Sequence, residues 1–461
     1  MQKNIHQILY NLVINYMNFY DKHIFKKLCK YTSKIDIIDL YNIDDKYSDR
    51  LDDSIINKYN NVVRLYVSTR SIISNVNHMT KLKELKNDGL NLHNIQIVGL
   101  TNLEILHVYK FTNNFDTTKL KELHVSGTDA ISHKDINNLT NLETLDISDN
   151  VYIFDLNHMT KLRKLVAKGF WCAIDNNSIK NLTNLEILNI AYNRNINELD
   201  HMTKLKELVA EGCTCGIDND SIKFLTNLEI LKISSNTKIT DIGHLTKLKE
   251  LDLSKSHVIY NKNIKNLTDL EILKINDNRI IININHMTKL KILDASGSGI
   301  NNECIQNVTN IEILNIGNCV EITNIRHMTK LKELVAFGTY GIDNQNINKM
   351  INLERLNVCD NPKITDINHL IKLKILDASG TCGIDNKGIK NLVNLETIYT
   401  LNNQKITNIC HLSKLQNHNG YEIYRKDNNN TFFQNIYLSY TSLKSKVCDS
   451  LYSAVNSWIV F

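Results

Sequence analysis

Two short phrases alternate along most of this chain and decide its fold. Residues His201–Leu208 read His-Met-Thr-Lys-Leu-Lys-Glu-Leu, and residues Leu225–Leu231 read Leu-Thr-Asn-Leu-Glu-Ile-Leu. Eight near-copies of the first phrase recur about every 42 residues between His78 and His411, with the second phrase between them. Self-similarity at a fixed period is typical of a solenoid, in which each unit buries its apolar face against the next. The chain is therefore predicted to be a repeat array.

Both phrases share one frame, with Leu at positions 1 and 4, an aliphatic residue or Ala at position 6, and Asn, Cys, Thr or Ser at position 9. Leu185, Leu188, Ile190 and Asn193 fill it in one unit. The frame resembles the leucine-rich repeat, whose units each supply one short parallel strand to a curved sheet. Position 1 falls at Val62, Leu82, Leu103, Leu120, Leu142, Leu162, Leu185, Leu205, Leu228, Leu248, Leu270, Leu290, Ile311, Leu331, Leu353, Leu373, Leu395 and Leu415. We therefore expect a solenoid over residues 35–416, with about eighteen repeats after one worn first unit.

Two unit types alternate and are named here by the charge at position 2, which is Lys or Arg in Lys-type units and Glu in Glu-type units. Lys-type units end in a pattern such as Ile384-Asp-Asn, in which an Asp or Asn cap precedes apolar residues at helical spacing. Glu-type units end in a tighter Ile-x-x-Ile-x-His pattern, as at Ile239 to His244, which suits an extended or 3₁₀ segment. The predicted fold class is α/β, a leucine-rich-repeat solenoid. Its curved parallel β-sheet forms the concave side, and short helices alternate with 3₁₀ or extended segments on the convex side.

Strand side chains alternate between two faces, so positions 4 and 6 should point into the core and positions 3, 5 and 7 toward the concave side. The side chain at position 9 should point into the core and form hydrogen bonds with backbone groups there. The alternating charges at position 2, such as Lys206, Glu229 and Lys249, place unlike charges side by side. We interpret them as a device that fixes the stacking register. The alternative is a charged stripe that binds a partner.

The repeated histidines, His78, His158, His201, His244, His286, His327, His369 and His411, form one column. Successive members should lie about 10 Å apart, because they are two strand spacings from one another. That separation is too large for two of them to share a zinc ion. The column is therefore predicted to make hydrogen bonds at the rim of the array. No metal site and no cofactor are expected.

Composition bears on location and chemistry. The net charge of +5 over 461 residues is modest, which argues against a nucleic-acid partner. No stretch reaches the roughly 18 apolar residues of a membrane span. Ten cysteines without framework spacing, including Cys213 and Cys319 at core positions, indicate reduced thiols in a cytoplasmic protein. The chain shows no nucleophile with a base and no phosphate-binding loop, so we expect no enzyme activity.

Residues 1–34 form a separate segment whose apolar pattern predicts two short helices. The order Ile8-Leu9, Leu12-Val13, Tyr16-Met17, Asp21 and Leu28-Cys29-Lys30 resembles a degenerate F-box. The opening Leu-Pro of that motif is absent, and no Trp follows Cys29. The resemblance implies that this segment binds Skp1, and a helical cap for the solenoid is the alternative. The residues assigned to partner binding here are Ile8, Leu9, Leu12, Val13, Met17, Ile24, Phe25 and Leu28.

Residues 417–461 are predicted to cap the other end. Tyr421 to Tyr440 indicates a hairpin with its tip near residues 428–430, and Ser442 to Trp458 indicates an amphipathic helix. That helix could instead bind a membrane or a partner.

The whole layout resembles the F-box and leucine-rich-repeat proteins of giant DNA viruses. The resemblance implies a substrate adaptor for a Skp1–cullin ubiquitin ligase, a monomer in the host cytoplasm that holds a protein on the concave face. The alternative is a scaffold or decoy that binds a host protein without ubiquitin transfer. The concave residues predicted to contact the partner are Tyr109, His124, Lys168, Tyr192, Glu211, Lys232, Lys274, Phe337 and Tyr399.

Overall fold

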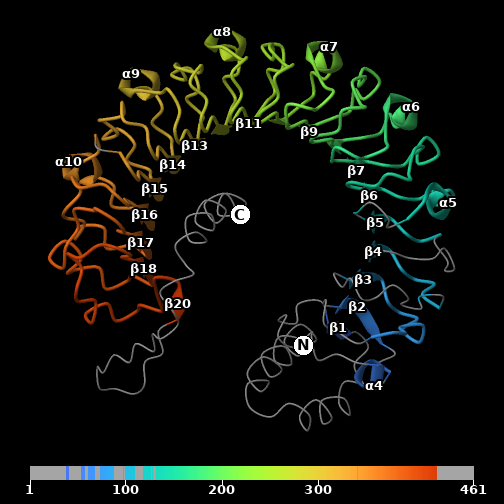
Figure 1. Ribbon diagram of the computed structural model, residues 1–461, viewed down its shortest axis with the longest axis horizontal. Coiled ribbons are helices and arrows are strands. Elements are labelled where there is room, and N and C mark those ends of the chain that lie inside the picture. Colours follow the sequence, from blue (N-terminus) through green and yellow to red (C-terminus); the bar gives the residue numbers. More distant parts are fainter. Residues whose placement is uncertain are drawn as a thin grey trace. The chain divides into compact units, whose positions relative to one another are not determined.

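The computed structural model describes residues 38–40, 53–57, 61–67, 73–87, 97, 99–108, 118–125, 127, 131–339 and 341–422. The chain divides into two compact units, residues 1–331 and 332–461. Within each unit, short strands pair in parallel to form a β-solenoid (Figure 1). The fold class predicted from the repeat period is confirmed.

The strands of unit 1 are short, and β3 to β14 each begin two residues after position 1 of the repeat frame. The strands are β1 (Ile38–Leu40), β2 (Val62–Val67), β3 (Glu84–Asn87), β4 (Ile105–His107), β5 (Glu122–His124), β6 (Thr144–Asp146), β7 (Lys164–Val166), β8 (Ile187–Asn189), β9 (Glu207–Val209), β10 (Ile230–Lys232), β11 (Glu250–Asp252), β12 (Ile272–Lys274), β13 (Ile292–Asp294) and β14 (Ile313–Asn315). Position 4 of one strand lies opposite position 4 of the next, as in Leu208, Leu231 and Leu251. The Leu residues therefore stack in register along the core.

Unit 2 repeats this arrangement and ends differently. Its strands are β15 (Glu333–Val335), β16 (Arg355–Asn357), β17 (Ile375–Asp377), β18 (Thr397–Tyr399), β19 (Asn417–His418) and β20 (Tyr421–Glu422). β19 and β20 pair antiparallel across Asn419 and Gly420, which both have positive φ. Asn-Gly is the residue pair that a two-residue hairpin turn favours. This turn lies before the predicted hairpin of residues 421–440, whose tip lies outside the described residues, as does the predicted helix of residues 442–458.

Short helices occur on the return side of the repeats, opposite the strands (Figure 1). They are α4 (Asp53–Ile56), α5 (His133–Ile136), α6 (Asn176–Ile179), α7 (Asn219–Ile222), α8 (Asn261–Ile264), α9 (Asn302–Ile305) and α10 (Asn344–Ile347). Asp218 shows how α7 begins, since its side chain accepts a hydrogen bond from the Ser221 backbone N–H at 3.0 Å. The Ser221 hydroxyl accepts in turn from the Asp218 N–H at 3.1 Å. These capping bonds satisfy the free donors of the first helical turn.

One predicted helix is wrong. The stretch that follows Asp385 forms turns over residues 386–390, although it carries the same cap pattern as the helical units. Gly388 stands where α6 and α7 have Ser178 and Ser221. Glycine disfavours a helix and supplies no side chain to close the capping box.

The Asn residues at position 9 connect successive repeats. The Asn236 amide nitrogen donates to the carbonyl oxygens of Ala210 and Ile217, at 3.1 and 3.4 Å. Its amide oxygen accepts from the backbone N–H groups of Lys238 and Ile239, at 2.8 and 3.1 Å. Because Asn236 is buried, these bonds satisfy backbone groups that water cannot reach. The inward role predicted for position 9 is confirmed in this unit, and Asn193, Asn278, Asn361 and Asn403 make equivalent bonds.

Candidate functional site

The histidine column has a structural role. The Nε2 atom of His201 lies 3.1 Å from the carbonyl oxygen of Ile179, the last residue of α6. This carbonyl also accepts from the backbone N–H of Leu182 at 2.9 Å, so the histidine is its second donor and links it to the next repeat. The same bond recurs at 2.9 to 3.2 Å for His78, His158, His244, His286, His327, His369 and His411. The predicted hydrogen bonding of this column is therefore confirmed, and these histidines hold repeats together.

The charges at position 2 also link repeats. Lys206 lies 2.7 Å from Glu186, and Lys249 lies 2.6 Å from Glu229. The hydrogen bond from Lys249 holds the pKa of Glu229 below its ordinary value. The lysine side chains are more than half exposed, so water and salt screen each pair and its contribution to stability is small. Their regular alternation agrees with a role in register, since every position-2 pair named here joins unlike charges.

The cysteine prediction is partly wrong. Cys319 is buried, as expected, but Cys213 is exposed. Cys215 is the buried residue in that loop, and its Sγ lies 3.6 Å from the carbonyl oxygen of Ile190. In this loop the inward position therefore falls two residues later than the frame predicts.

The structure places eight of the nine predicted concave residues on the strand side or at the adjoining loop edge. His124, Lys232 and Lys274 lie on β5, β10 and β12 in unit 1, and Tyr399 lies on β18 in unit 2. Lys168, Tyr192, Glu211 and Phe337 lie in the loops that directly follow strands. All eight are exposed or half-buried. Tyr109 lies outside the described residues, as do all the F-box-like residues.

The strand face of β9 to β13 carries alternating charge. Lys232, Asp252, Lys274 and Asp294 occupy position 5 of four successive strands. Lys232 forms an ion pair with Glu250 at 3.1 Å. Burial and the nearby Asp252 raise the pKa of Glu211 above its ordinary value. This face therefore offers partly desolvated charges of both signs, which suits a polar macromolecular partner.

Aromatic side chains gather where the chain leaves β7 and β8. Phe170 and Trp171 pack edge to face with ring centroids 4.9 Å apart, and the Arg194 guanidinium lies 4.6 Å from the Phe170 ring centroid. Tyr192 follows β8, and a Cβ atom on Gly212 would lie 2.5 Å from its ring. Trp171 is 63% exposed and Tyr192 is 52% exposed. We call Phe170, Trp171, Tyr192 and Arg194 the aromatic edge.

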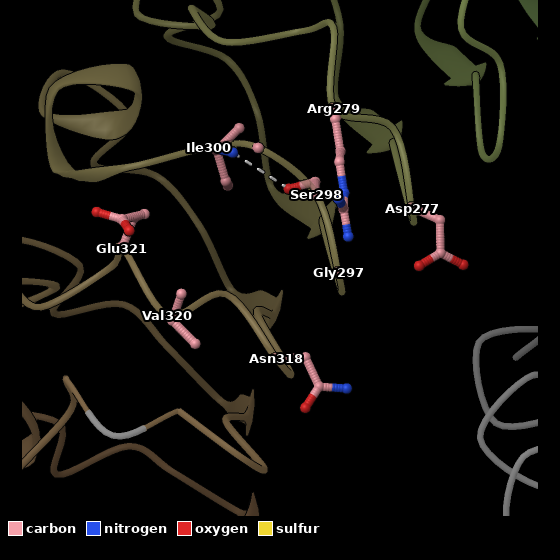
Figure 2. A pocket seen from close by; sticks show the side chains of 9 residues that line it. Asp277, Arg279, Gly297, Ser298, Ile300, Asn318, Val320 and Glu321 are labelled. Carbon is pink, nitrogen blue, oxygen red and sulfur yellow. Dashed lines mark hydrogen bonds between the residues drawn. The ribbon is translucent and has the colours of Figure 1, made fainter.

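A hollow of about 480 Å³ opens farther along unit 1, where the loops leave β12, β13 and β14 (Figure 2). Asp277, Arg279 and Glu321 supply charged groups to its lining, while Ile300 and Val320 supply apolar ones. The hollow lies at the same ends of the strands as the aromatic edge.

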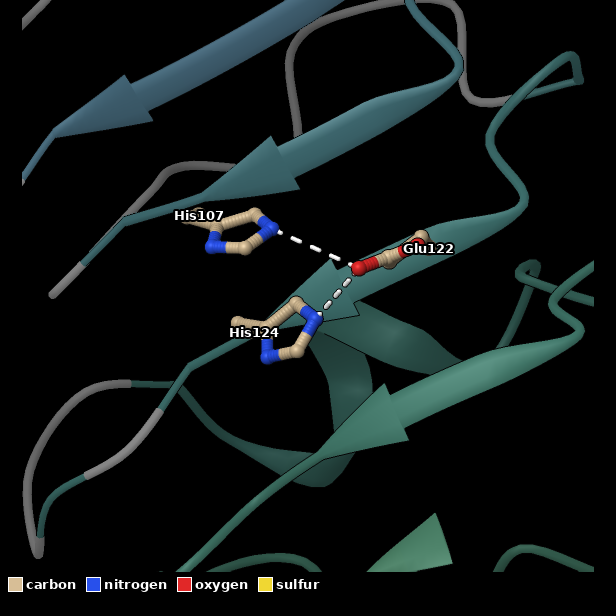
Figure 3. A group of neighbouring side chains, drawn as sticks. All are labelled: His107, Glu122 and His124. Carbon is tan, nitrogen blue, oxygen red and sulfur yellow. Dashed lines mark hydrogen bonds and ion pairs between the residues drawn. The ribbon is translucent and has the colours of Figure 1, made fainter. Parts of the chain in front are cut away.

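A compact histidine cluster lies on β4 and β5 (Figure 3). The Nε2 atom of His124 is 2.7 Å from Glu122 Oε1, and the Nε2 atom of His107 is 3.5 Å from the same oxygen. The two imidazole rings stack with centroids 3.9 Å apart. Asp146 on β6 lies on the other side of His124, with its Oδ2 atom 3.7 Å from His124 Nδ1.

The surroundings of the two imidazoles shift their pKa values in opposite directions. Burial opposes the charge on His124, but its bonds to Asp146 and Glu122 outweigh burial and raise the pKa of this imidazole. Burial and the neighbouring His124 lower the pKa of His107. Only His124 was singled out from the sequence; His107 and Glu122 were missed.

No protein-family model and no curated protein matches this chain. Among solved structures, it is similar to an internalin of Listeria monocytogenes, with 22% identity, 79% of this chain and 88% of that chain covered, and a TM-score of 0.40. The functional domain of InlJ from Listeria monocytogenes, which includes a cysteine ladder, is 19% identical, with 73% and 77% covered and a TM-score of 0.40. A leucine-rich-repeat protein of Leptospira interrogans is 18% identical, with 82% and 98% covered and a TM-score of 0.43.

The fold assignment rests on the chain's own geometry. The repeat frame sets one short strand per unit, the strands pair in parallel and in register, and the buried asparagines join Glu-type units to the Lys-type units before them. Among the described residues, no helix is long and apolar enough to span a membrane. In fold, the chain is a parallel β-solenoid of leucine-rich-repeat type.

Proposed function

We propose that this chain binds a protein partner through the strand face of unit 1 and the adjoining aromatic edge. The proposal rests mainly on the exposure of Trp171 and Tyr192. These two side chains belong to the aromatic edge, in which Arg194 lies on the Phe170 ring. Trp, Tyr and Arg are the residues most often responsible for binding energy at protein interfaces. Solenoids of stacked repeats generally present such extended binding surfaces.

The repeated positions and the variable positions of each unit have different roles, and this difference supports the proposal. The positions that recur from unit to unit are occupied in building the array: Leu in the core, Asn236 on backbone groups, and His201 on a helix carbonyl. The residues at positions 5, 7 and 8 differ from unit to unit. A recognition surface needs residues that can differ from unit to unit. The residues at these positions can differ because the packing of the scaffold does not constrain them.

The test compares two exposed aromatic surfaces of the same unit. Proteins captured by the tagged chain are identified, and the affinity of the purified partner is measured by calorimetry for the wild type and for variants. The double variant Trp171→Ala, Tyr192→Ala should bind at least tenfold more weakly, a loss of about 1.4 kcal/mol or more. Its melting temperature should stay close to that of the wild type, because both side chains are mostly exposed.

Phe224 supplies the matched control. It is 54% exposed and lies just after α7, on the return side of its repeat. Phe224→Ala should leave the affinity within about twofold of the wild type. Equal losses in both variants, or no loss in the double variant, would contradict the proposed surface.

We further propose, as the more specific function, that the chain is an adaptor that brings its bound protein to a Skp1–cullin ubiquitin ligase in the cytoplasm of a host cell. The support is the F-box-like order of apolar residues over positions 5–34, which lie outside the described residues. A scaffold or decoy that binds without ubiquitin transfer is the alternative for the same binding surface.

A pull-down with purified Skp1 separates these two functions. An adaptor should retain Skp1, and Leu12→Asp or Phe25→Asp should each abolish retention, because a buried charge without a partner is costly. Asn18→Asp introduces the same charge at a polar position of the same segment and should have little effect. Failure of the wild-type chain to retain Skp1 would leave the scaffold or decoy as the function.

A further inference from the structure

His107 and His124, on β4 and β5, do not belong to the histidine column. The hydrogen bonds of that column to helix carbonyls therefore do not explain why these two side chains lie together. Parallel pairing places His107 directly opposite His124, and Glu122 lies two residues before His124 on the same strand. Alternate residues of a strand share a face, so all three side chains leave the sheet on the same side. Figure 3 shows both imidazole rings directing Nε2 toward the Glu122 carboxylate.

Each ring nitrogen of His124 faces a carboxylate oxygen. A neutral imidazole carries one N–H donor, yet His124 faces Glu122 through Nε2 and Asp146 through Nδ1. If Nδ1–H points to Asp146, the Nε2 lone pair faces a carboxylate oxygen, and the Nε2 atom of His107 lies 3.5 Å from the same oxygen. A cation among these three atoms would satisfy two nitrogens and one carboxylate together.

We propose that His107 Nε2, His124 Nε2 and Glu122 Oε1 bind a Zn²⁺ ion. Imidazole nitrogen and carboxylate oxygen are ordinary zinc ligands, and two His with one Glu is a known ligand set. Asp146 is the outer carboxylate that orients His124, the partner that metal-bound imidazoles usually have. Asp146 is itself held, since its Oδ1 accepts from the Ser148 hydroxyl at 2.6 Å and from the Ser148 N–H at 3.0 Å.

The distances require little movement. Ligands about 2.05 Å from a tetrahedral zinc lie about 3.3 to 3.4 Å from one another. The three ligand atoms lie within 4.8 Å of one another, and the contact from His107 to Glu122 is already 3.5 Å. The contact from His124 to Glu122 must lengthen from 2.7 Å, and the stacked rings must tilt so that both lone pairs meet the ion. All three residues are half-buried, so these side chains have room to turn.

Three protein ligands leave a fourth coordination position. It would face the open side of the strand face and take water, or a donor atom from a bound protein. The proposal is independent of the partner-binding function, because zinc binding is measured on the chain alone.

The test uses the untagged full chain after treatment with EDTA. Calorimetry with Zn²⁺ should show one tight site, and Co²⁺ should give the visible absorption of a tetrahedral complex. His107→Ala and His124→Ala should each weaken Zn²⁺ binding at least 100-fold. Asp146→Asn keeps the three ligands and should weaken binding about 10- to 100-fold.

The control is His418→Ala, which removes another half-buried strand-face histidine, one that lies 2.9 Å from the Thr400 hydroxyl. This variant should bind Zn²⁺ like the wild type. Circular dichroism shows whether each variant is folded, and the wild-type titration does not depend on any variant. A wild-type chain that binds no Zn²⁺ at micromolar concentration, or that binds it equally well without His107 and His124, would overturn the proposal.

Discussion

Replacing Asn236 with alanine is expected to lower the free energy of unfolding by about 3 to 5 kcal/mol. The substitution removes the donor for the carbonyl oxygens of Ala210 and Ile217 and the acceptor for the N–H groups of Lys238 and Ile239. Each buried group left without a partner costs about 1 to 3 kcal/mol, and partial relaxation recovers some of that sum. Urea denaturation followed by circular dichroism measures the change.

Asn227 provides the control within the same repeat. Its amide nitrogen donates to the Thr203 carbonyl at 3.0 Å, but the pair is exposed, so water can replace the bond. Asn227→Ala should therefore cost less than about 1 kcal/mol. Similar losses for the two variants would show that the buried asparagines do not hold the repeats together in the way described above.

Replacing Gly216 with alanine is expected to destabilise the protein by about 2 to 3 kcal/mol. A Cβ atom at this position would lie 2.3 Å from the carbonyl oxygen of Ile196 and 3.0 Å from that of Arg194. Both atoms belong to the backbone of the preceding repeat, so neither can rotate away. Relief of the clash requires the repeats to move apart, which weakens packing in the core.

Gly243→Ala is the matched control, and the same denaturation experiment measures it. The nearest atoms to a Cβ atom at Gly243 lie 3.4 Å away, which is close to ordinary contact, and its φ is not positive. Alanine should therefore be neutral there, or stabilising by about 0.4 to 1 kcal/mol, because it restricts the unfolded chain. Destabilisation of both variants to the same extent would contradict the close approach of repeats at Gly216.

Much of the fold could be predicted from the sequence because each structural requirement recurs many times. Leu at positions 1 and 4, Asn at position 9 and His in the column each occupy one environment, so their spacing identifies that environment. The predictions that were wrong concern units whose residues depart from the repeat frame. The stretch that contains Gly388 forms turns instead of a helix, and the buried cysteine of the loop after β9 is Cys215 instead of Cys213.

The histidine cluster could not be predicted from the sequence, for a different reason. His107, Glu122 and His124 form no motif along the chain, and only the pairing of β4 with β5 brings them together. The available signal was the occurrence of His at position 5 in two consecutive repeats. Aligning the frames shows that coincidence, but the stacking of the rings and the orientation of Asp146 depend on side-chain conformations that spacing does not determine.

The repeated residues build the array, and we propose that the strand side and its aromatic edge bind the partner. Site-specific photo-cross-linking tests this proposal most directly, with a photoreactive phenylalanine analogue placed at Tyr192 or at Phe224. The two positions are almost equally exposed, at 52% and 54%, but lie on opposite sides of the repeats. The purified partner should cross-link from position 192 and not from position 224. Cross-linking from position 224 alone, or equally from both positions, would contradict the proposal.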